Sequence, residues 1–219
     1  MANVRLLFDE IASCTLCKRL VEYRRSIKPP PRFRAWEYWN RPVPGFGDES
    51  ARVLIVGLAP AAHGGNRTGR VFTGDESGRW VIRGLYELGL TNKEEGVSAD
   101  DGLEVKEVYL TNAVKCAPPD NRPTREEIAN CSRFLREELM LLPNVKVILA
   151  LGRVAFEAVL SLYGVRAEFR HGASVELPDG KVLIASYHPS AQNTRTGRLS
   201  WGEWLAVLRS AYEIARSRS

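Results

Sequence analysis

The sequence lacks any long hydrophobic run. No segment approaches the ~18 consecutive uncharged apolar residues that a membrane-spanning helix requires. At the amino terminus, Asp9 and Glu10 interrupt the region where a secretory signal needs an unbroken apolar segment. We therefore expect a cytoplasmic protein with no membrane contact.

Cysteine is also scarce, with 4 residues in a chain of 219. In a reducing compartment these are not expected to form disulfide staples, so a special arrangement of them indicates metal or redox chemistry. With 44% hydrophobic and 26% charged residues, a chain of this length buries a sufficient core without cross-links. The composition predicts a single globular domain over residues 1–219 and excludes collagenous, disordered and membrane classes.

Common glycine-rich phosphate motifs are missing from the loop that follows the first predicted strand. That loop, residues 59–76, contains neither G-x-G-x-x-G nor Gly-Lys-Ser/Thr. We therefore expect no nucleotide cofactor and no ordinary nucleotide hydrolysis.

Positive charge is concentrated in one segment. Residues 18–41 carry eight basic and two acidic side chains, a local charge of +6, whereas the whole chain has a net charge of +5. Three prolines and five aromatic residues are interleaved with these charges, which favours an ordered, non-helical stretch. Basic residues mixed with aromatics are typical of contact with a nucleic-acid backbone. The alternative is a solvated basic face whose aromatic side chains cover the core.

Four short apolar runs predict strands at residues 52–58, 108–113, 145–151 and 182–187. They are rich in β-branched residues and nearly continuous in hydrophobicity, as in parallel strands that are covered on both faces. Apolar residues at helical spacing separate them. This alternation predicts an α/β fold with a central four-stranded, mainly parallel sheet flanked by helices, and residues 168–177 suggest an additional small hairpin.

The loops after these strands are the expected place for chemistry. In an open parallel sheet, loops converge at the carboxyl ends of the strands, and helix amino termini point toward them. Here the loops at residues 59–76, 114–121 and 188–198 are together rich in Gly, Pro, Asn and His.

The cysteines form two spaced pairs. Cys14 and Cys17 form a C-x2-C motif in the first predicted helical stretch, Cys116 follows the second strand, and Cys131 lies in the next helix. Four thiolates complete the coordination shell of zinc or of an iron–sulfur cluster. Zinc ribbons usually pair two short motifs in a compact hairpin, whereas ~100 residues separate these pairs, which favours a 4Fe–4S cluster over zinc. Four unrelated buried thiols are the alternative.

Four loop motifs together resemble the uracil-DNA glycosylase superfamily: GLAPA at 57–61, GRVFTG at 69–74, TNAVKCAPP at 111–119 and HPS at 188–190. The resemblance covers nearly the whole chain and is closest to the thermophile-type iron–sulfur members. Ala59 stands where sister groups carry an acidic or polar residue that handles the attacking water, and this form resembles the type b, or family 5, enzymes. The resemblance implies a uracil-DNA glycosylase-like fold stapled by the cysteine cluster, and removal of uracil and other deaminated or damaged bases from DNA.

Cleavage of an N-glycosidic bond needs hydrogen-bond donors toward the departing base and a wall on which the base stacks. We expect His188 to donate to uracil O2, Asn112 to meet the N3–H and O4 edge, and Phe72 to stack on the flipped base. Gly57 and Ala59 complete the expected base-binding set. The alternatives are a backbone contact for Asn112 and core positions for Phe72 and His188.

Asp75 has two interpretations. The spacing of Thr73 and Glu76 fits a capping box for a helix over about residues 75–88, where an acidic first turn is favourable. Alternatively, Asp75 is catalytic and orients water or stabilises the sugar cation. We expect His63 to contact the ligand or the loop.

Excision of a base from duplex DNA requires the nucleotide to leave the stack. We expect the loop after HPS to face the DNA, together with arginines of the first loop. The expected DNA contacts are Arg67, Arg70, Ser190, Gln192, Asn193, Arg195 and Arg198.

The sequence therefore predicts a monofunctional, monomeric DNA repair glycosylase that acts by base flipping on uracil-containing DNA. No lysine is placed in the active loops to form a Schiff base, Lys115 being the nearest exception. The alternatives are a metal-stapled nucleic-acid-binding module without catalysis and an enzyme that acts on free nucleosides.

Overall fold

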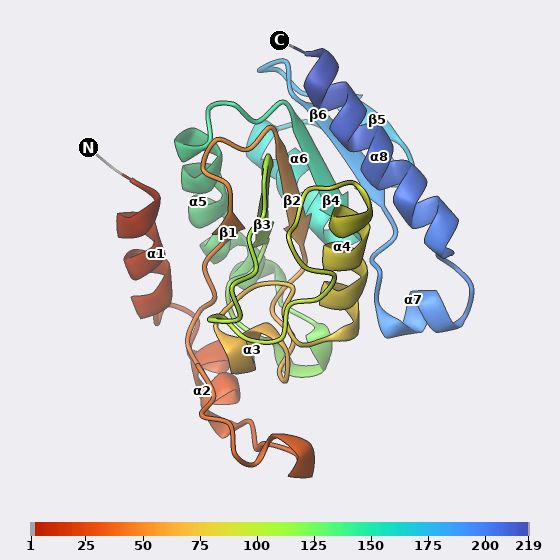
Figure 1. Ribbon diagram of the computed structural model, residues 1–219. Coiled ribbons are helices and arrows are strands. Elements are labelled where there is room, and N and C mark those ends of the chain that lie inside the picture. The colour runs from red at the N-terminus through yellow and green to blue at the C-terminus, as the bar shows by residue number, and fades with distance from the viewer. Residues whose placement is uncertain (1–2, 219) are drawn as a thin grey trace.

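A mixed sheet forms the centre of the computed structural model, which describes residues 3–218 (Figure 1). Within these residues the sheet has six strands in the order β1-β3-β2-β4-β6-β5. Its inner strands are parallel: β3 (Val108–Asn112), β2 (Val53–Gly57), β4 (Val147–Leu151) and β6 (Val182–Ser186). Every residue of these four strands is buried, which explains their continuous hydrophobicity.

The four predicted strands are confirmed, but the prediction of a four-stranded sheet was wrong, because two antiparallel strands are added at the edges. β1 (Phe46–Gly47) pairs with β3, and β5 (Ser174–Glu176) pairs with β6. β5 lies in the segment where a hairpin was expected, and its partner is the strand that follows it. β1 has two residues, too few for any periodic signal to appear in the sequence.

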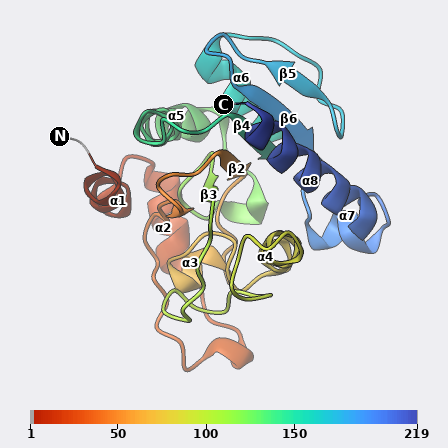
Figure 2. The same ribbon diagram turned by 45° about the horizontal axis from the view of Figure 1, so that its top comes forward.

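Helices cover both faces of the sheet (Figures 1 and 2). α4 (Glu76–Glu87) and α8 (Trp201–Ser217) pack on one face. α5 (Arg125–Leu141) and α6 (Arg153–Tyr163) pack on the other. Alternate residues of each strand pack into the hydrophobic cores on the two faces, so the sheet is held between the two helical layers. No helix within residues 3–218 combines the length and the apolarity that crossing a bilayer requires.

The amino-terminal region departs from expectation at two points. α1 (Val4–Ser13) ends before the C-x2-C motif, so Cys14 and Cys17 lie in the turn between α1 and α2 (Lys18–Ser26) rather than inside a helix. The predicted non-helical wrap over residues 18–41 is wrong for its first part, which is α2. The run of prolines stops the helix, because proline lacks the N–H that a helix needs, and a short 3-10 turn, η1 (Pro31–Phe33), follows.

Three further short elements belong to the loops beyond the strand ends. They are α3 (Gly65–Thr68), η2 (Pro119–Asn121) and α7 (Ala191–Arg195). Each lies in one of the loops in which chemistry was expected.

Candidate active site

The ends of β2 and β3 bring Gly57 and Asn112 side by side as register partners. A Cβ on Gly57 would collide with Asn112 Oδ1 and would lie 2.7 Å from Phe72 Cζ. Gly57 therefore leaves the space in which the Asn112 amide and the Phe72 ring converge. Asn112 is 3% exposed, and no hydrogen bond formed within residues 3–218 uses its side-chain amide. The amide is thus available to bind a ligand.

Phe72 is held in an unusual backbone conformation, with φ at +49°. Its carbonyl oxygen packs against Gly78 in the first turn of α4, where a Cβ would collide with it. The ring belongs to the core formed by α4 and α8, as in the alternative interpretation of Phe72, and its stacking on a base stays a prediction. Left-handed backbone at a bulky residue is costly and clusters at functional sites, so the geometry also suits a fixed stacking wall.

Replacing Gly57 with alanine is expected to destabilise the fold by about 1–3 kcal/mol, because the added methyl group overpacks a filled site. Asn112 and Phe72 must then move apart, so the base excision that the sequence predicts should slow by more than the loss of folded protein explains. Thermal unfolding and single-turnover excision measure the two effects. A Gly57→Ala variant of unchanged activity per folded molecule contradicts the convergence of these side chains on substrate.

His188 follows β6 and is half-buried. Burial lowers the pKa of its imidazole to about 4, so the ring is neutral at physiological pH. Nδ1 is buried and has no hydrogen-bond partner within residues 3–218. The His188 carbonyl accepts hydrogen bonds from Ser190 N at 2.8 Å and from Asn193 Nδ2 at 2.9 Å. The backbone is therefore anchored while the ring keeps hydrogen-bonding capacity for a ligand.

Asp75 is the N-cap of α4, and its Oδ1 accepts a hydrogen bond from Gly78 N at 2.8 Å. The predicted cap at Thr73 is wrong, because that hydroxyl accepts from Arg70 Nε and donates to the Val71 carbonyl. The Asp75 carboxyl group packs against Gly64, where a Cβ would collide with Oδ2. Burial raises the pKa of Asp75 above its ordinary value.

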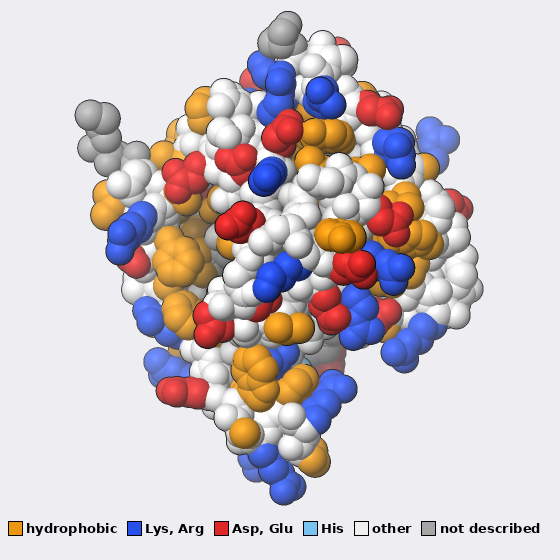
Figure 3. Space-filling model, viewed as in Figure 1, with side chains coloured by type: hydrophobic (Ala, Val, Ile, Leu, Met, Phe, Trp, Pro, Cys, Tyr) orange, Lys and Arg blue, Asp and Glu red, His pale blue; other side chains and the backbone are white. Residues whose placement is uncertain are grey.

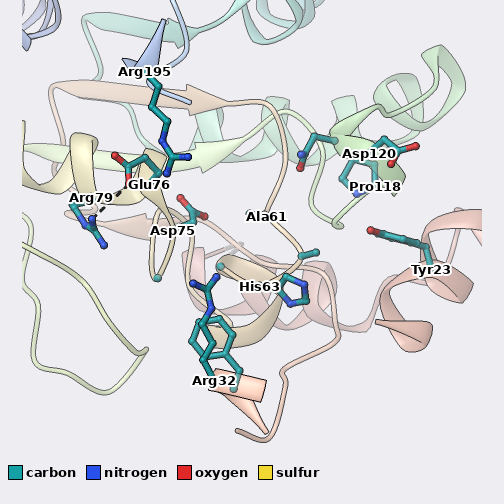
Figure 4. A pocket seen from close by; sticks show the side chains of 15 residues that line it. Tyr23, Arg32, Ala61, His63, Asp75, Glu76, Arg79, Pro118, Asp120 and Arg195 are labelled. Atoms are coloured by element: carbon teal, nitrogen blue, oxygen red, sulfur yellow. Dashed lines mark ion pairs between the residues drawn. The ribbon is translucent and has the colours of Figure 1, made fainter. Parts of the chain in front are cut away.

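A cleft of about 530 Å³ opens beside Asp75 (Figure 4). Its lining comes from the loops after β2, β3 and β6, which confirms that these loops converge. α2 and η1, both in the basic segment 18–41, add a further wall. The lining residues are Tyr23, Arg32, Phe33, Ala61, Ala62, His63, Gly64, Gly74, Asp75, Glu76, Arg79, Pro118, Asp120, Asn121 and Arg195.

The ring of His63 contacts the segment before β1 rather than its own loop, and its contact with a ligand stays a prediction. Its Nδ1 lies 2.9 Å from the Tyr38 hydroxyl, and burial together with Arg32 and Arg67 lowers the pKa of its ring. The imidazole also lines the cleft.

Several lining residues escaped the sequence analysis. Arg79 pairs with Glu76 at 3.5 Å and with Glu95 at 3.3 Å, but in the sequence it is an ordinary exposed helix residue. Asp120 and Asn121 both have left-handed backbone, with φ of 53° and 55°. Their Pro-Pro-Asp-Asn context signals a turn, and only the fold shows that this turn reaches the cleft.

The structure corrects two of the expected DNA contacts. Arg67 and Arg70 are each 4% exposed. Arg70 forms a bidentate pair with Asp101, at 2.9 and 2.7 Å, so its guanidinium is satisfied internally and does not reach a phosphate. Arg67 lies against the rings of Phe33 and Trp36.

The loop after β6 divides into internal and exposed side chains. Ser190 caps α7, and Asn193 anchors the His188 carbonyl. Gln192, Arg195 and Arg198 are exposed, and Arg195 lines the cleft. Their DNA contacts stay a prediction.

The four cysteines lie in one region. Cys116 and Cys131 share a buried cluster against which Cys17 and Ala59 pack, and Cys14 lies close enough to act on the thiols of Cys17 and Cys116. Within residues 3–218, no three Cys, His, Asp or Glu side chains are gathered into a metal-ligand set, so the staple stays a prediction. The thiols nevertheless lie close enough to interact, because Cys14 and Cys131 add to the burial that raises the pKa of Cys116. Burial raises the pKa of Cys116 to about 12 and that of Cys131 to about 11.

The surroundings of these thiols fit an anionic group. Arg24 is 3% exposed, and its Nη1 donates to Cys116 Sγ at 3.1 Å. Its other acceptors are the carbonyls of Asn40 and Cys14, and within residues 3–218 it pairs with no carboxylate. Asn130 Nδ2 also donates to Cys17 Sγ, at 3.5 Å. A buried cation without a counter-charge is costly, and metal-bound thiolates would supply that charge.

Lys115 is 1% exposed and therefore does not reach the cleft. Its Nζ lies 2.7 Å from Glu138 Oε2 and 2.6 Å from Thr111 Oγ1. This buried network ties the loop after β3 to α5. The amine is thus held away from substrate.

The comparisons with known proteins agree with this architecture. A model of the uracil DNA glycosylase superfamily matches residues 44–209, and the chain belongs to this superfamily. Two type-5 uracil-DNA glycosylases are each 53% identical: that of Pyrobaculum aerophilum over 204 residues, 93% of this chain and 89% of the relative, and that of Thermus thermophilus over 209 residues, 94% and 95%. A type-4 uracil-DNA glycosylase of Pyrobaculum aerophilum is 33% identical over 162 residues, 71% and 74%. The resemblance to family 5 is thereby confirmed.

Proposed function

We propose that this protein is a monofunctional DNA repair glycosylase that hydrolyses the N-glycosidic bond of uracil and other deaminated bases in DNA. The observation that carries the proposal is the position of Asn112, a buried residue whose amide forms no internal hydrogen bond within residues 3–218 and converges with the Phe72 ring over Gly57 at the strand ends. An amide offers a carbonyl to uracil N3–H and an N–H to O4 in one two-point contact. Membership of the superfamily supports the same reaction.

The remaining groups have roles that their surroundings support. A neutral imidazole at His188 donates to uracil O2 as negative charge grows on the departing base. The Asp75 carboxylate, which lines the cleft, stabilises the sugar cation or orients water. Lys115 is held by Glu138, so no Schiff base forms with it and the reaction is hydrolysis.

DNA enters along the basic rim of the cleft, which Arg32, Arg79 and Arg195 line. The target nucleotide leaves the base stack and enters the site.

We expect DNA affinity to fall steeply with salt, with a log–log slope of roughly −4 to −5 for about five phosphate contacts. Fluorescence anisotropy at several salt concentrations measures the slope. An Arg195→Gln variant should reduce it by about 1. A flat dependence in the unmodified protein contradicts the DNA interface.

The thiols of Cys14, Cys17, Cys116 and Cys131 would hold a 4Fe–4S cluster that ties the amino-terminal helices to the body of the protein. When bound, the cluster supplies a structural cross-link and thiolate charge opposite Arg24. It takes no part in the excision step.

The purified protein is therefore expected to be brown and to contain iron and sulfide. Elemental analysis and visible absorption test this expectation. Replacing Cys116 with alanine should lower the melting temperature and abolish the absorption, because the site couples metal binding to folding. A colourless protein with stoichiometric zinc would contradict the cluster and keep the four-thiolate site, whereas a stable metal-free protein would contradict both.

The proposed activity is tested by release of free uracil from uracil-containing oligonucleotides, with the thymine oligomer and free deoxyuridine as controls. We expect an abasic product from the uracil oligomer and none from the controls. DNA binding without an abasic product would favour a binding module, and cleavage of deoxyuridine would favour a nucleoside enzyme. Borohydride trapping of an enzyme–DNA adduct would contradict monofunctional hydrolysis.

A further inference from the structure

One wall of the cleft comes from a segment with little regular structure. Residues 27–41, here called the arm, follow α2 and contain the 3-10 turn η1. The arm extends from the lower end of the molecule in Figure 1, where Figure 3 shows basic and apolar side chains together. Its residues Arg32 and Phe33 line the cleft. Because the arm has no regular backbone hydrogen-bond ladder beyond η1, contacts with another segment must fix its position.

Arg67 supplies the centre of those contacts. The guanidinium carbon lies 4.1 Å from the ring centroids of both Phe33 and Trp36. Arg67 Nε donates to the His63 carbonyl at 2.7 Å, and the Arg67 carbonyl accepts from Trp39 N at 3.0 Å. One residue of the loop after β2 thus contacts three points of the arm and the cleft-lining His63.

Contacts on either side of Arg67 reinforce this junction. Asn66 Nδ2 donates to Asn40 Oδ1 at 2.9 Å, and Asn40 N donates to the Asn66 carbonyl at 3.1 Å. Gly69 packs under Trp39, where a Cβ would lie 3.1 Å from the indole. The arm is therefore seated on α3 and its flanking residues.

The positive charge of Arg67 is buried without a direct ion pair within residues 3–218. The residue is 4% exposed, and no ion pair within residues 3–218 involves its guanidinium. Nη1 is buried without a hydrogen-bond partner, and Gly74 leaves room for Nη2, with which a Cβ would collide. The ring faces of Phe33 and Trp36 lie directly against this buried cation, and the Asp75 carboxylate adds an electrostatic attraction. A guanidinium presents two planar faces, which a lysine ammonium does not.

We propose that Arg67 is a positioning residue whose guanidinium, held by Phe33 and Trp36, docks the arm and thereby places Arg32 and Phe33 at the cleft for the DNA beside the target nucleotide. The proposal rests on the proposed function only for the identity of the substrate. The docking itself is a property of the free protein. Arg67 acts through the arm, so its loss weakens DNA binding more than the excision step.

The test uses the full-length protein and an Arg67→Met variant, which keeps much of the side-chain volume and removes the charge. We expect the dissociation constant for uracil-containing DNA to rise about tenfold, in the range of one desolvated cation–π contact. At a pH well above the pKa of Asp75, the single-turnover rate at saturating DNA should stay within about threefold, because Arg67 acts on that carboxylate only by lowering its pKa. Hydrogen exchange of the arm amides should accelerate, while exchange in β2 and β4 stays unchanged.

An Arg34→Met variant is the matched control, since Arg34 is an exposed arginine of the same arm. It should leave arm exchange unchanged. In a Trp36→Leu background, the Arg67→Met change should have a clearly smaller effect on DNA affinity, because its partner ring is already gone.

Wild-type arm exchange in Arg67→Met overturns the proposal, as does a loss of affinity that merely follows global stability. Accelerated exchange with unchanged DNA affinity overturns the role in substrate placement. If the unmodified protein releases no uracil, the proposed function fails, whereas the exchange and binding measurements still decide the role of Arg67.

Discussion

Replacing His188 with alanine is expected to lower the single-turnover rate of uracil release by roughly 10²–10³, the usual loss for one donor aimed at a developing oxyanion. The imidazole is neutral, and its backbone is anchored by Ser190 and Asn193. A neutral donor in a fixed position stabilises the departing base without reorganising during the reaction. Single-turnover kinetics at saturating enzyme measure the loss directly.

The matched control is His171→Ala. His171 stacks on Tyr187, and its Nδ1 accepts from Tyr187 N at 3.0 Å, so its ring is engaged within the fold, whereas His188 Nδ1 has no partner within residues 3–218. Its loss should alter stability and leave the excision rate per folded molecule unchanged. Equal rates in the His188→Ala and unmodified proteins would contradict the role of His188.

The pH dependence follows from the same pKa. The folded-state pKa of His188 is about 4. The excision rate should therefore not depend on the ionisation of His188 above pH 4, and it should fall as the pH drops through about 4. The unfolded-chain pKa is about 6.5, so the unfolded state binds the proton first and stability also falls as pH drops below about 6.5. The rate must therefore be corrected for the folded fraction.

Replacing Asp75 with asparagine is expected to lower the excision rate by roughly 10²–10⁴, the range for a positioned acid–base or charged group. Asparagine caps helices as well as aspartate does, so the bond to Gly78 N survives while the charge is lost. DNA affinity should not fall, because removal of an acid from a basic rim cannot weaken attraction to phosphate. The raised pKa of Asp75 also predicts that activity declines on acidification at a higher pH than an exposed aspartate would give.

Comparison with Asp75→Ala separates catalysis from capping. The alanine variant loses both the charge and the cap, and the loss of a cap costs about 1 kcal/mol of stability. Full activity in Asp75→Asn, with a loss in Asp75→Ala that only follows unfolding, would show that Asp75 is a helix cap and that the reaction needs no carboxylate there.

The inner strands could be predicted because burial on both faces leaves a local signal. β2 and β4 are buried throughout, so their sequences are continuous apolar runs. The edge strand β1 carries no such signal, since two residues show no period and the pairing with β3 is made by the partner. Likewise, the sequence shows that Thr73 and Asp75 both lie near a helix start, but not which of these side chains accepts the N-cap hydrogen bond.

The sequence by itself determined the parallel core, the loops that meet at its carboxyl edge, and the side-chain types gathered there, because each depends on residues close together in the chain. Only the tertiary structure decided which polar side chains are free. Arg70 is neutralised by Asp101, and Arg67 is enclosed by rings of the arm, while Asn112 is buried without a partner. The reason is physical: a long polar side chain is exposed, paired or available for a ligand according to neighbours supplied by distant segments, and no local pattern records those neighbours.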